Sequence, residues 1–335
     1  MSSLGLRVVL AAVAALAGAT AIVYAATRAG EAGPSRASEA SWAALAPSPL
    51  ARTEVGAARI GDRVYVVGGF ISSGGTTGRM VRYDISADRW RRVADLPIAV
   101  NHPGVTALGG RLYLAGGNLP GAGAGEPKSD RLYSYSPRRD RWRRLSDMPT
   151  ARAALALGGT DGRLYAAGGY SESDFQLRTL EIYDLHRGRW TRGPAMPTGR
   201  NHVGAAVLDG ELVVTGGRPG PTNGGLATVE SYDPEARRWS TLPPLETARS
   251  GHAAAVVSGR LVVLGGEELG PAGQTIEQVE TFDPGAAGAW SELPQMITPR
   301  HGVGAAARAG RIYALEGGPQ PGLAYSAALE YLDVR

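Results

Sequence analysis

Six tryptophans recur at near-constant intervals along the chain, and a pair of glycines follows each of them at an almost fixed distance. The second glycine of the pair lies 27, 27, 27, 27, 27 and 28 residues after the tryptophan. A period of 48 to 52 residues, held over six units, indicates one supersecondary unit copied six times. The tryptophans and glycines are Trp42, Trp90, Trp142, Trp190, Trp239 and Trp290, and Gly69, Gly117, Gly169, Gly217, Gly266 and Gly318.

Each unit is expected to contain four antiparallel strands. An apolar segment leads to a two-residue turn such as Asp209-Gly210, whose residue types supply the positive φ angles of tight hairpins. A second strand closes on the glycine pair, a third ends at a step such as Tyr232-Asp233-Pro234, and a hairpin leads into the tryptophan strand. Such units build either a propeller around a central channel or an open solenoid.

The ends of the chain favour the propeller. The sixth unit stops at Arg335, before a tryptophan strand of its own, and the missing strand is found at 41–46, ahead of the first complete unit. A closed ring completes its last blade in this way and leaves no exposed sheet edge. We therefore predict an all-β, six-bladed propeller over 41–335, with its last blade closed by the N-terminal strand.

The repeats resemble the Kelch family. The resemblance rests on the glycine pair, the Tyr-Asp-Pro-like step, and a tryptophan spaced before Leu-Pro or Met-Pro, as in Trp90 to Pro97 and Trp190 to Pro197. It covers about residues 41 to 335 and implies the propeller fold. It leaves the function open, because similar propellers serve as protein-binding domains, sugar mutarotases and copper oxidases.

An apolar segment precedes the repeats. Residues 8–26 carry no charge and approach the ~20 residues that span a bilayer, while small residues such as Ala19 and Ala21 also offer cleavage sites. We expect residues 1–27 to be a transmembrane signal anchor or a cleaved signal peptide, and residues 28–40 to be a flexible linker. Either reading places the propeller outside the cytoplasm, anchored to the membrane by this segment or secreted.

Composition excludes several chemistries. The chain has no cysteine, so disulfides, thiolate metal sites, cysteine nucleophiles and a galactose-oxidase-like cofactor are excluded. The net charge of +4 comes from arginines in turns interleaved with acids, and no basic stripe carries stacking aromatics, so nucleic-acid binding is not expected. The Kelch-repeat unit is expected to be a monomer.

Length variation among the repeats is confined to one loop per blade, after the glycine pair, on the face that the blade-entry segments share. Ten residues after five of the six tryptophans stands an arginine, which is interpreted as structural, with attraction of an anionic ligand as the alternative. The neighbouring positions vary in chemistry although their flanks repeat. The expected ligand-binding rim comprises Glu54, Asn101, His102, Asn201, His202 and His301, with Phe70, Tyr170 and Arg218 from the position after the glycine pairs.

The sequence predicts a binding module that recognises a protein or a cell-surface glycan through this mouth. In a Kelch protein that captures acidic peptides the matching positions carry arginines, which argues against that ligand here. The alternative is a sugar mutarotase or epimerase, similar to the exported sialic acid mutarotases, with Glu54 and a histidine as acid and base. No cofactor is expected, although two histidines and a carboxylate at Glu54, His102 and His202 are a recognised ligand set for divalent metals.

Overall fold

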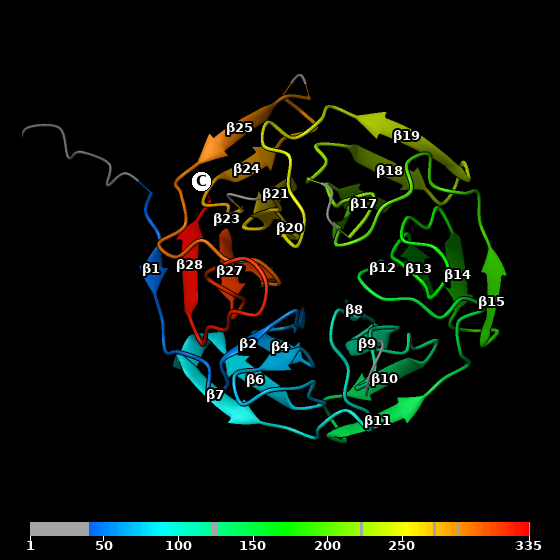
Figure 1. Cartoon of the computed structure of the whole chain (residues 1–335), viewed down its shortest axis with the longest axis horizontal. Coiled ribbons are helices and arrows are strands. Elements are labelled where there is room, and N and C mark those ends of the chain that lie inside the picture. Colours follow the sequence, from blue (N-terminus) through cyan, green and yellow to red (C-terminus); the bar gives the residue numbers. More distant parts are fainter. Residues whose placement is uncertain (1–39, 122–125, 222–223, 271–272, 287, 335) are drawn as a thin grey trace, which may run out of the picture. The chain divides into compact units, whose positions relative to one another are not determined.

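The protein is described from a computed structural model, over residues 40–121, 126–221, 224–270, 273–286 and 288–334. The unit beginning at Ala40 is a ring of six four-stranded antiparallel sheets around a central channel (Figure 1). Apart from one 3-10 turn at Ile85–Ala87, the described ranges contain strands and loops only. The all-β six-bladed propeller is therefore confirmed.

Each of the first five blades is a meander whose strands follow one another from the channel to the outer edge. The strands are β3 (Gly56–Ile60), β4 (Arg63–Val67), β6 (Met80–Asp84) and β7 (Arg89–Arg92); β8 (Gly104–Leu108), β9 (Arg111–Ala115), β10 (Leu132–Ser136) and β11 (Arg141–Arg144); β12 (Ala156–Thr160), β13 (Arg163–Ala167), β14 (Leu180–Asp184) and β15 (Arg189–Arg192). They continue with β16 (Gly204–Leu208), β17 (Glu211–Thr215), β18 (Val229–Asp233) and β19 (Arg238–Leu242); β20 (Ala253–Val257), β21 (Arg260–Leu264), β24 (Val279–Phe282) and β25 (Trp290–Leu293).

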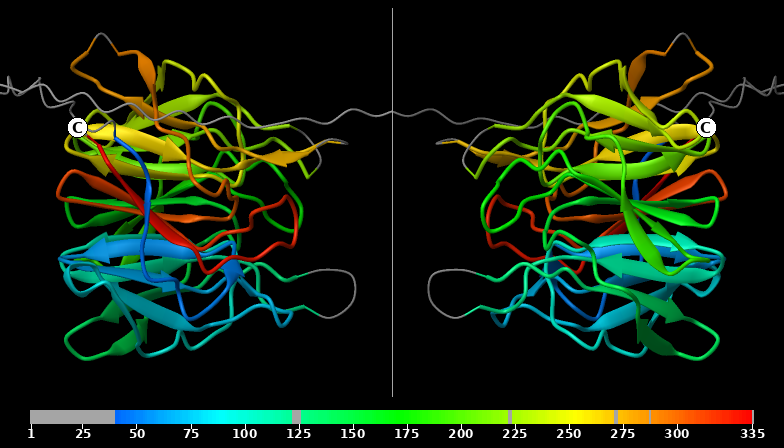
Figure 2. Two further views of the ribbon diagram at one scale, coloured as in Figure 1. Left: turned by 90° about the vertical axis from the view of Figure 1, so that its left-hand side faces the viewer. Right: turned by 90° about the vertical axis from the view of Figure 1, so that its right-hand side faces the viewer.

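The sixth blade contains β26 (Gly304–Arg308), β27 (Arg311–Leu315) and β28 (Leu329–Asp333), and its outer strand is β1 (Ala43–Ala44). β1 pairs antiparallel with β28, so the two ends of the propeller share one sheet (Figure 2). Two short ribbons, β2 (Arg52–Thr53) with β5 (Phe70–Ile71) and β22 (Glu267–Glu268) with β23 (Gln274–Thr275), lie at the ends of the blades.

The repeated tryptophans connect neighbouring blades. The indole N–H of each donates to the carbonyl oxygen of the residue four positions after the preceding tryptophan, at 2.7 to 3.0 Å. Trp42 completes this circle, because its partner is Pro294, four residues after Trp290. The pattern repeats because each outer strand meets the preceding blade in the same way.

The hydrophobic core lies between blades rather than at one centre. One cluster, for example, joins Tyr65 and Met80 of the first blade to Leu112 and Leu114 of the second. Another joins Val64 of the first blade to Leu315 of the sixth across the point of closure. Each blade therefore buries its faces only when both neighbours are present.

The repeated arginines are fully buried inside the ring and do not form a cationic rim. Arg200 is typical: its Nη1 donates to Glu230 at 2.7 Å, and its Nη2 to the carbonyl oxygen of Val214 at 3.0 Å. Four of the five arginines pair with a glutamate of their own blade, whereas Arg52 pairs with Glu316 of the adjacent sixth blade. Because every charge is paired in the interior, the alternative of an anion-attracting ring is wrong. The five arginines are Arg52, Arg152, Arg200, Arg249 and Arg300.

The last glycine pair is displaced by one residue from its expected position. The amide of Gly317 donates to the carbonyl oxygen of Arg52, as the amide of Gly169 does to Arg200, so Gly317 is the equivalent of the earlier second glycines. The tryptophan-to-glycine interval is therefore 27 in this unit too, from Trp290 to Gly317. The first glycine is replaced by Glu316, which has a φ of 57° and pairs with Arg52 at 2.7 Å.

The predicted anchor or signal at 1–27, and the linker up to residue 39, lie outside the described residues. Within the described ranges, no helix has both the length and the apolar character needed to span a bilayer.

Candidate functional site

The mouth of the channel is ringed by one residue from the entry segment of each blade. All six have left-handed φ angles between 52° and 64°, a region that non-glycine residues rarely adopt. Backbone hydrogen bonds hold these residues in place. From the second blade to the sixth, the amide of each ring residue donates to the carbonyl oxygen of the ring residue in the preceding blade at 2.7 to 3.1 Å. The amide of Val55 donates to the carbonyl oxygen of Gly302 at 3.3 Å and so completes the ring. The ring residues are Glu54, His102, Ala154, His202, Gly251 and Gly302.

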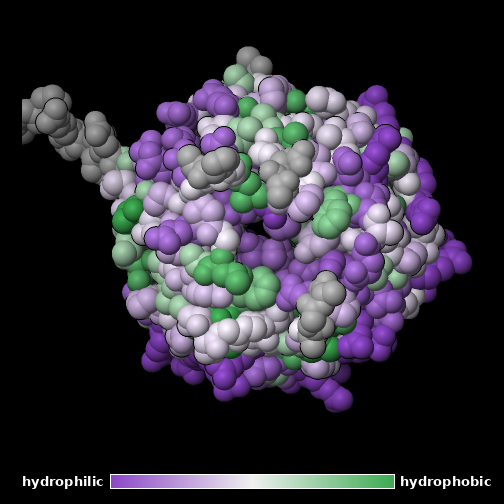
Figure 3. All heavy atoms as spheres, in the orientation of Figure 1, coloured by the Kyte–Doolittle hydropathy of each residue, from purple (hydrophilic) through white to green (hydrophobic). Residues whose placement is uncertain are grey.

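Only three members of this ring carry polar side chains, and the other three are alanine or glycine. The small residues leave a cavity of about 80 Å³ at the ring. The space-filling view shows a hollow at the centre of this face with hydrophilic residues in its wall (Figure 3). The repeat thus provides a symmetric frame, and the departures from symmetry create the site.

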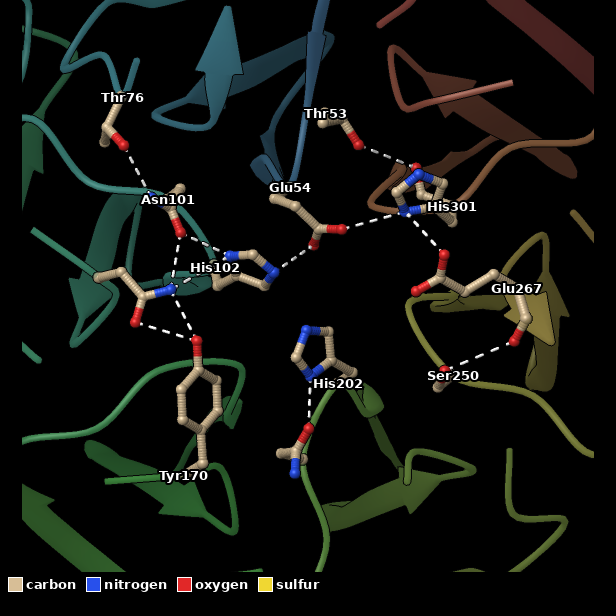
Figure 4. A network of polar contacts seen from close by, with 12 residues as sticks. Thr53, Glu54, Thr76, Asn101, His102, Tyr170, His202, Ser250, Glu267 and His301 are labelled. Carbon is tan, nitrogen blue, oxygen red and sulfur yellow. Dashed lines mark hydrogen bonds and ion pairs between the residues drawn. The ribbon is translucent and has the colours of Figure 1, made fainter. Parts of the chain in front are cut away.

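Glu54 lies between two histidines from opposite directions around the ring. Its Oε2 lies 3.1 Å from Nε2 of His102, and its Oε1 lies 3.1 Å from Nδ1 of His301. Figure 4 shows this arrangement, with a second carboxylate, Glu267, 3.6 Å from the same nitrogen of His301. The Glu54 side chain is 12% exposed, so these contacts form largely out of solvent.

Two asparagines orient the two ring histidines. Nδ1 of His102 lies 2.6 Å from Oδ1 of Asn101, and Nδ1 of His202 makes the same contact with Oδ1 of Asn201. Asn101 and Asn201 were expected to contact a ligand at the rim, but both are buried. Each asparagine is therefore placed to fix a histidine that immediately follows it in the sequence.

Arg218 links His202 to the fifth blade. Its Nη2 lies 2.9 Å from Nε2 of His202, and its Nη1 donates to Oε1 of Glu267 at 3.0 Å. Nε of Arg218 and Oε2 of Glu267 are buried and have no hydrogen-bond partner among the described residues. Buried polar atoms of this kind usually find water or a ligand.

Aromatic rings line the opposite side of the mouth. Tyr170 is stacked on His202 with ring centroids 5.9 Å apart, and also on Phe175 at 6.0 Å. Its hydroxyl exchanges hydrogen bonds with the Asn118 side chain at 2.8 and 3.1 Å. Phe70 meets the edge of His102 at 5.9 Å. An apolar face thus adjoins the hydrogen-bonding groups.

The environment shifts the pKa of Glu54 and of the three histidines around it. Burial alone would raise the pKa of Glu54, but the neighbouring histidines outweigh burial and lower it. Burial lowers the pKa of His102, and burial with Arg218 lowers that of His202 well below its usual value. Burial also acts to lower the pKa of His301, but Glu54 and Glu267 raise it overall.

Burial raises the pKa of Tyr170 to about 12. Near neutral pH the mouth therefore contains an ionised Glu54, a neutral His202 and a neutral Tyr170 phenol. His301 is the histidine that these surroundings favour in its protonated form.

The structure brings Glu54, His102, His202 and Arg218 together around the channel axis, with Tyr170 and Phe70 beside them. His301 is 2% exposed and contacts Glu54. Because of the one-residue displacement in the last unit, the position after its glycine pair is Gly318, which pairs with His301.

Sequence reasoning did not single out Asn118 and Glu267 as site residues. Both follow a glycine pair, at the same position as Tyr170 and Arg218. This shared position in the repeat could have indicated both residues. Their contacts, of Asn118 with Tyr170 and of Glu267 with Arg218, each join two blades. The periodicity of one strand could not show such pairs.

Residues 101–318 match the model of the KLHDC2/KLHL20/DRC7 Kelch-repeats domain, and residues 51–97 match the Kelch motif. The chain therefore belongs to the Kelch-repeat family, whose propellers generally bind proteins.

A particular solved structure, entitled "Structure of YjhT", is similar in fold. It has a TM-score of 0.73 and 16% identity, and the match covers 85% of this chain and 96% of that one. At this identity the likeness concerns the fold alone. No curated protein matches the sequence.

Proposed function

We propose that this Kelch propeller is an extracytoplasmic binding module whose channel mouth takes a terminal sugar of a cell-surface glycan. The observation that carries the proposal is a group of aromatic rings at the channel mouth beside buried polar atoms that lack a hydrogen-bond partner. Phe70 and Tyr170 supply aromatic rings beside the ring histidines. Nε of Arg218 and Oε2 of Glu267 are buried without a hydrogen-bond partner among the described residues, although this Glu267 oxygen lies 3.6 Å from Nδ1 of His301. A sugar ring presents an apolar face and several hydroxyls, and so complements both.

A glycan suits the mouth better than a broad protein surface. The ring cavity is narrow, and its polar groups converge on the axis instead of spreading over the rim. Protein interfaces usually bury about 800 Å² per partner and are centred on large anchors. Of the aromatic residues here, Phe175, 49% exposed, is the one that reaches furthest into solvent. Protein binding remains the competing outcome of the test.

The location outside the cytoplasm is supported by the uncharged segment at 8–26. The same segment is proposed to anchor the chain to the membrane, or to direct its secretion if it is cleaved.

A glycan array probed with the full chain tests the binding function. We expect binding to one class of terminal sugar, weakened at least 10-fold by Arg218→Ala and by Tyr170→Ala, because each removes a group that contacts His202 at the channel mouth. His186→Ala is the matched control, since His186 is exposed on an outer turn. Binding that persists in both mouth variants would place the ligand elsewhere, and a purely protein ligand would contradict the glycan proposal.

A sugar mutarotase or epimerase is the second candidate. Glu54 contacts His102 and His301 at 3.1 Å each, which gives adjacent groups able to accept and donate a proton. Proton exchange spectroscopy of the anomers of any bound sugar tests this reaction. Acceleration by the wild-type chain, abolished in Glu54→Gln while sugar binding persists, is expected for the enzyme. Equal exchange rates with and without protein would rule it out.

A further inference from the structure

We propose that Glu54, His102 and His202 bind one divalent transition-metal ion of the Zn²⁺ class at the centre of the channel mouth. One potential ligand atom from each residue lies within 4.8 Å of the other two. The three residues come from the first, second and fourth blades, and the closed backbone ring brings them to the axis. The proposal does not depend on which ligand the Kelch domain recognises.

The hydrogen bonds of His102 leave room for a cation between this histidine and Glu54. The amide nitrogen of Asn101 donates to Thr76 at 2.7 Å and to a carboxylate oxygen of Glu126 at 3.0 Å. Its oxygen must therefore face His102 and accept from Nδ1. In the neutral ring this leaves an unprotonated Nε2 only 3.1 Å from the Glu54 carboxylate. Two acceptors at that distance require a proton or a metal ion between them.

His202 has the same orientation for the same reason. The amide nitrogen of Asn201 donates to the carbonyl oxygen of Phe175, so its oxygen accepts from Nδ1 of His202. Nε2 of His202 then faces the centre of the ring, as Figure 4 shows, and lies 2.9 Å from Nη2 of Arg218. Both histidines thus present the same nitrogen to one point.

Each proposed ligand is also held from behind. Asn101 and Asn201 hold the two histidines, and His301 holds the outer oxygen of Glu54 at 3.1 Å. Metal-binding histidines generally donate their second N–H to a fixed acceptor, which sets the tautomer and the ring orientation. The contacts of His102 and His202 match this arrangement.

Imidazole and carboxylate ligands favour Zn²⁺ and similar ions, whereas Mg²⁺ and Ca²⁺ prefer oxygen alone. Three protein ligands would leave one tetrahedral position for water or for a ligand oxygen.

Arg218 competes with the metal. Its Nη2 occupies the lone pair of His202 at 2.9 Å, while its Nη1 pairs with Glu267. Metal binding would break the first contact and leave the second. Removing this guanidinium should therefore strengthen metal binding, although the same change should weaken glycan binding. Because Arg218→Ala should change the affinities for metal and for glycan in opposite directions, the two proposals can fail independently.

The test is a Zn²⁺ titration of the full chain, stripped with a chelator and free of any histidine tag. We expect one Zn²⁺ per chain and no competition by excess Mg²⁺. Glu54→Gln, His102→Ala and His202→Ala should abolish the site, and His186→Ala should leave it unchanged. Asn101→Leu and Asn201→Leu should each weaken binding by about 10- to 100-fold, the usual effect of losing such a partner. Arg218→Ala should tighten it.

Co²⁺ provides a readout that needs no variant. The wild-type chain loaded with Co²⁺ should show the visible absorption of a low-coordinate site with nitrogen and oxygen ligands, and Zn²⁺ should displace it. Less than one bound Zn²⁺ per chain, together with the absence of this Co²⁺ spectrum, would overturn the proposal. His102 and Glu54 would then share a proton. Unchanged Zn²⁺ binding in a folded Glu54→Gln, His102→Ala, His202→Ala triple variant would also overturn it.

Discussion

Because Trp42 and its strand close the ring, we expect truncation of the N-terminus to lower the stability of the propeller once this strand is removed. Deleting residues 1–38 removes no part of a blade, whereas deleting residues 1–50 removes β1 and Trp42. The Trp42 side chain is 7% exposed, and loss of such a side chain costs about 3–5 kcal/mol. Backbone hydrogen bonds from Leu45 to Leu329 and from Ser48 to Ala327 add about 1 kcal/mol each.

The longer deletion should therefore lower the free energy of unfolding by about 5–7 kcal/mol, a large part of the 5–15 kcal/mol typical of a folded domain. In urea, followed by circular dichroism, a slope of about 3 kcal/mol per molar implies a midpoint lower by about 2 M. The shorter deletion should leave the midpoint unchanged, and Trp42→Ala in the full chain should cost about 3–5 kcal/mol. Equal midpoints for the two truncations would refute the reasoning that the N-terminal strand closes the ring.

Two further predictions concern the buried ion pairs. Glu230→Ala should lower the free energy of unfolding in urea by about 3–5 kcal/mol, because Arg200 is left charged and unpaired. The double variant with Arg200→Met and Glu230→Met should recover most of this lost stability. A double variant as unstable as the single one would contradict this account. Glu316→Gly restores the glycine of the repeat at a φ of 57° and should gain at most about 1 kcal/mol from the backbone. It should nevertheless lower the stability of the protein overall, because it leaves the buried Arg52 without its carboxylate partner. A raised melting temperature would show that backbone strain outweighs the ion pair.

The sequence predicted the fold well because the repeat is a local signal. Strand spacing, turn chemistry and the glycine pair are written within about 50 residues, and six copies average out local exceptions. The last glycine pair was predicted one residue too late because Glu316 replaces its first glycine. The side chain of Glu316 pairs with Arg52 of another blade. Arg52 lacks an acidic partner at the position that Glu230 occupies for Arg200, since Val81 stands there in the first blade.

The candidate site was only partly predictable. Variation within a conserved frame pointed to Glu54, His102 and His202, because positions that differ while their flanks repeat are not fixed by packing alone. It could not distinguish a residue that faces the axis from one that supports it, such as Asn101 and Asn201, which are buried beside the histidines. The difference depends on side-chain contacts with the adjacent histidines.

The sequence by itself determined that this protein is a ring of six Kelch blades, because a repeated pattern can bury its apolar faces only against copies of itself. Tertiary structure alone decided what the ring presents. It turned five arginines inward to glutamates, connected the tryptophans blade to blade, and brought Glu54, His102 and His202 within 4.8 Å of one another. Residues nearly 150 positions apart in the sequence meet there because closure places equivalent positions of every blade around one axis.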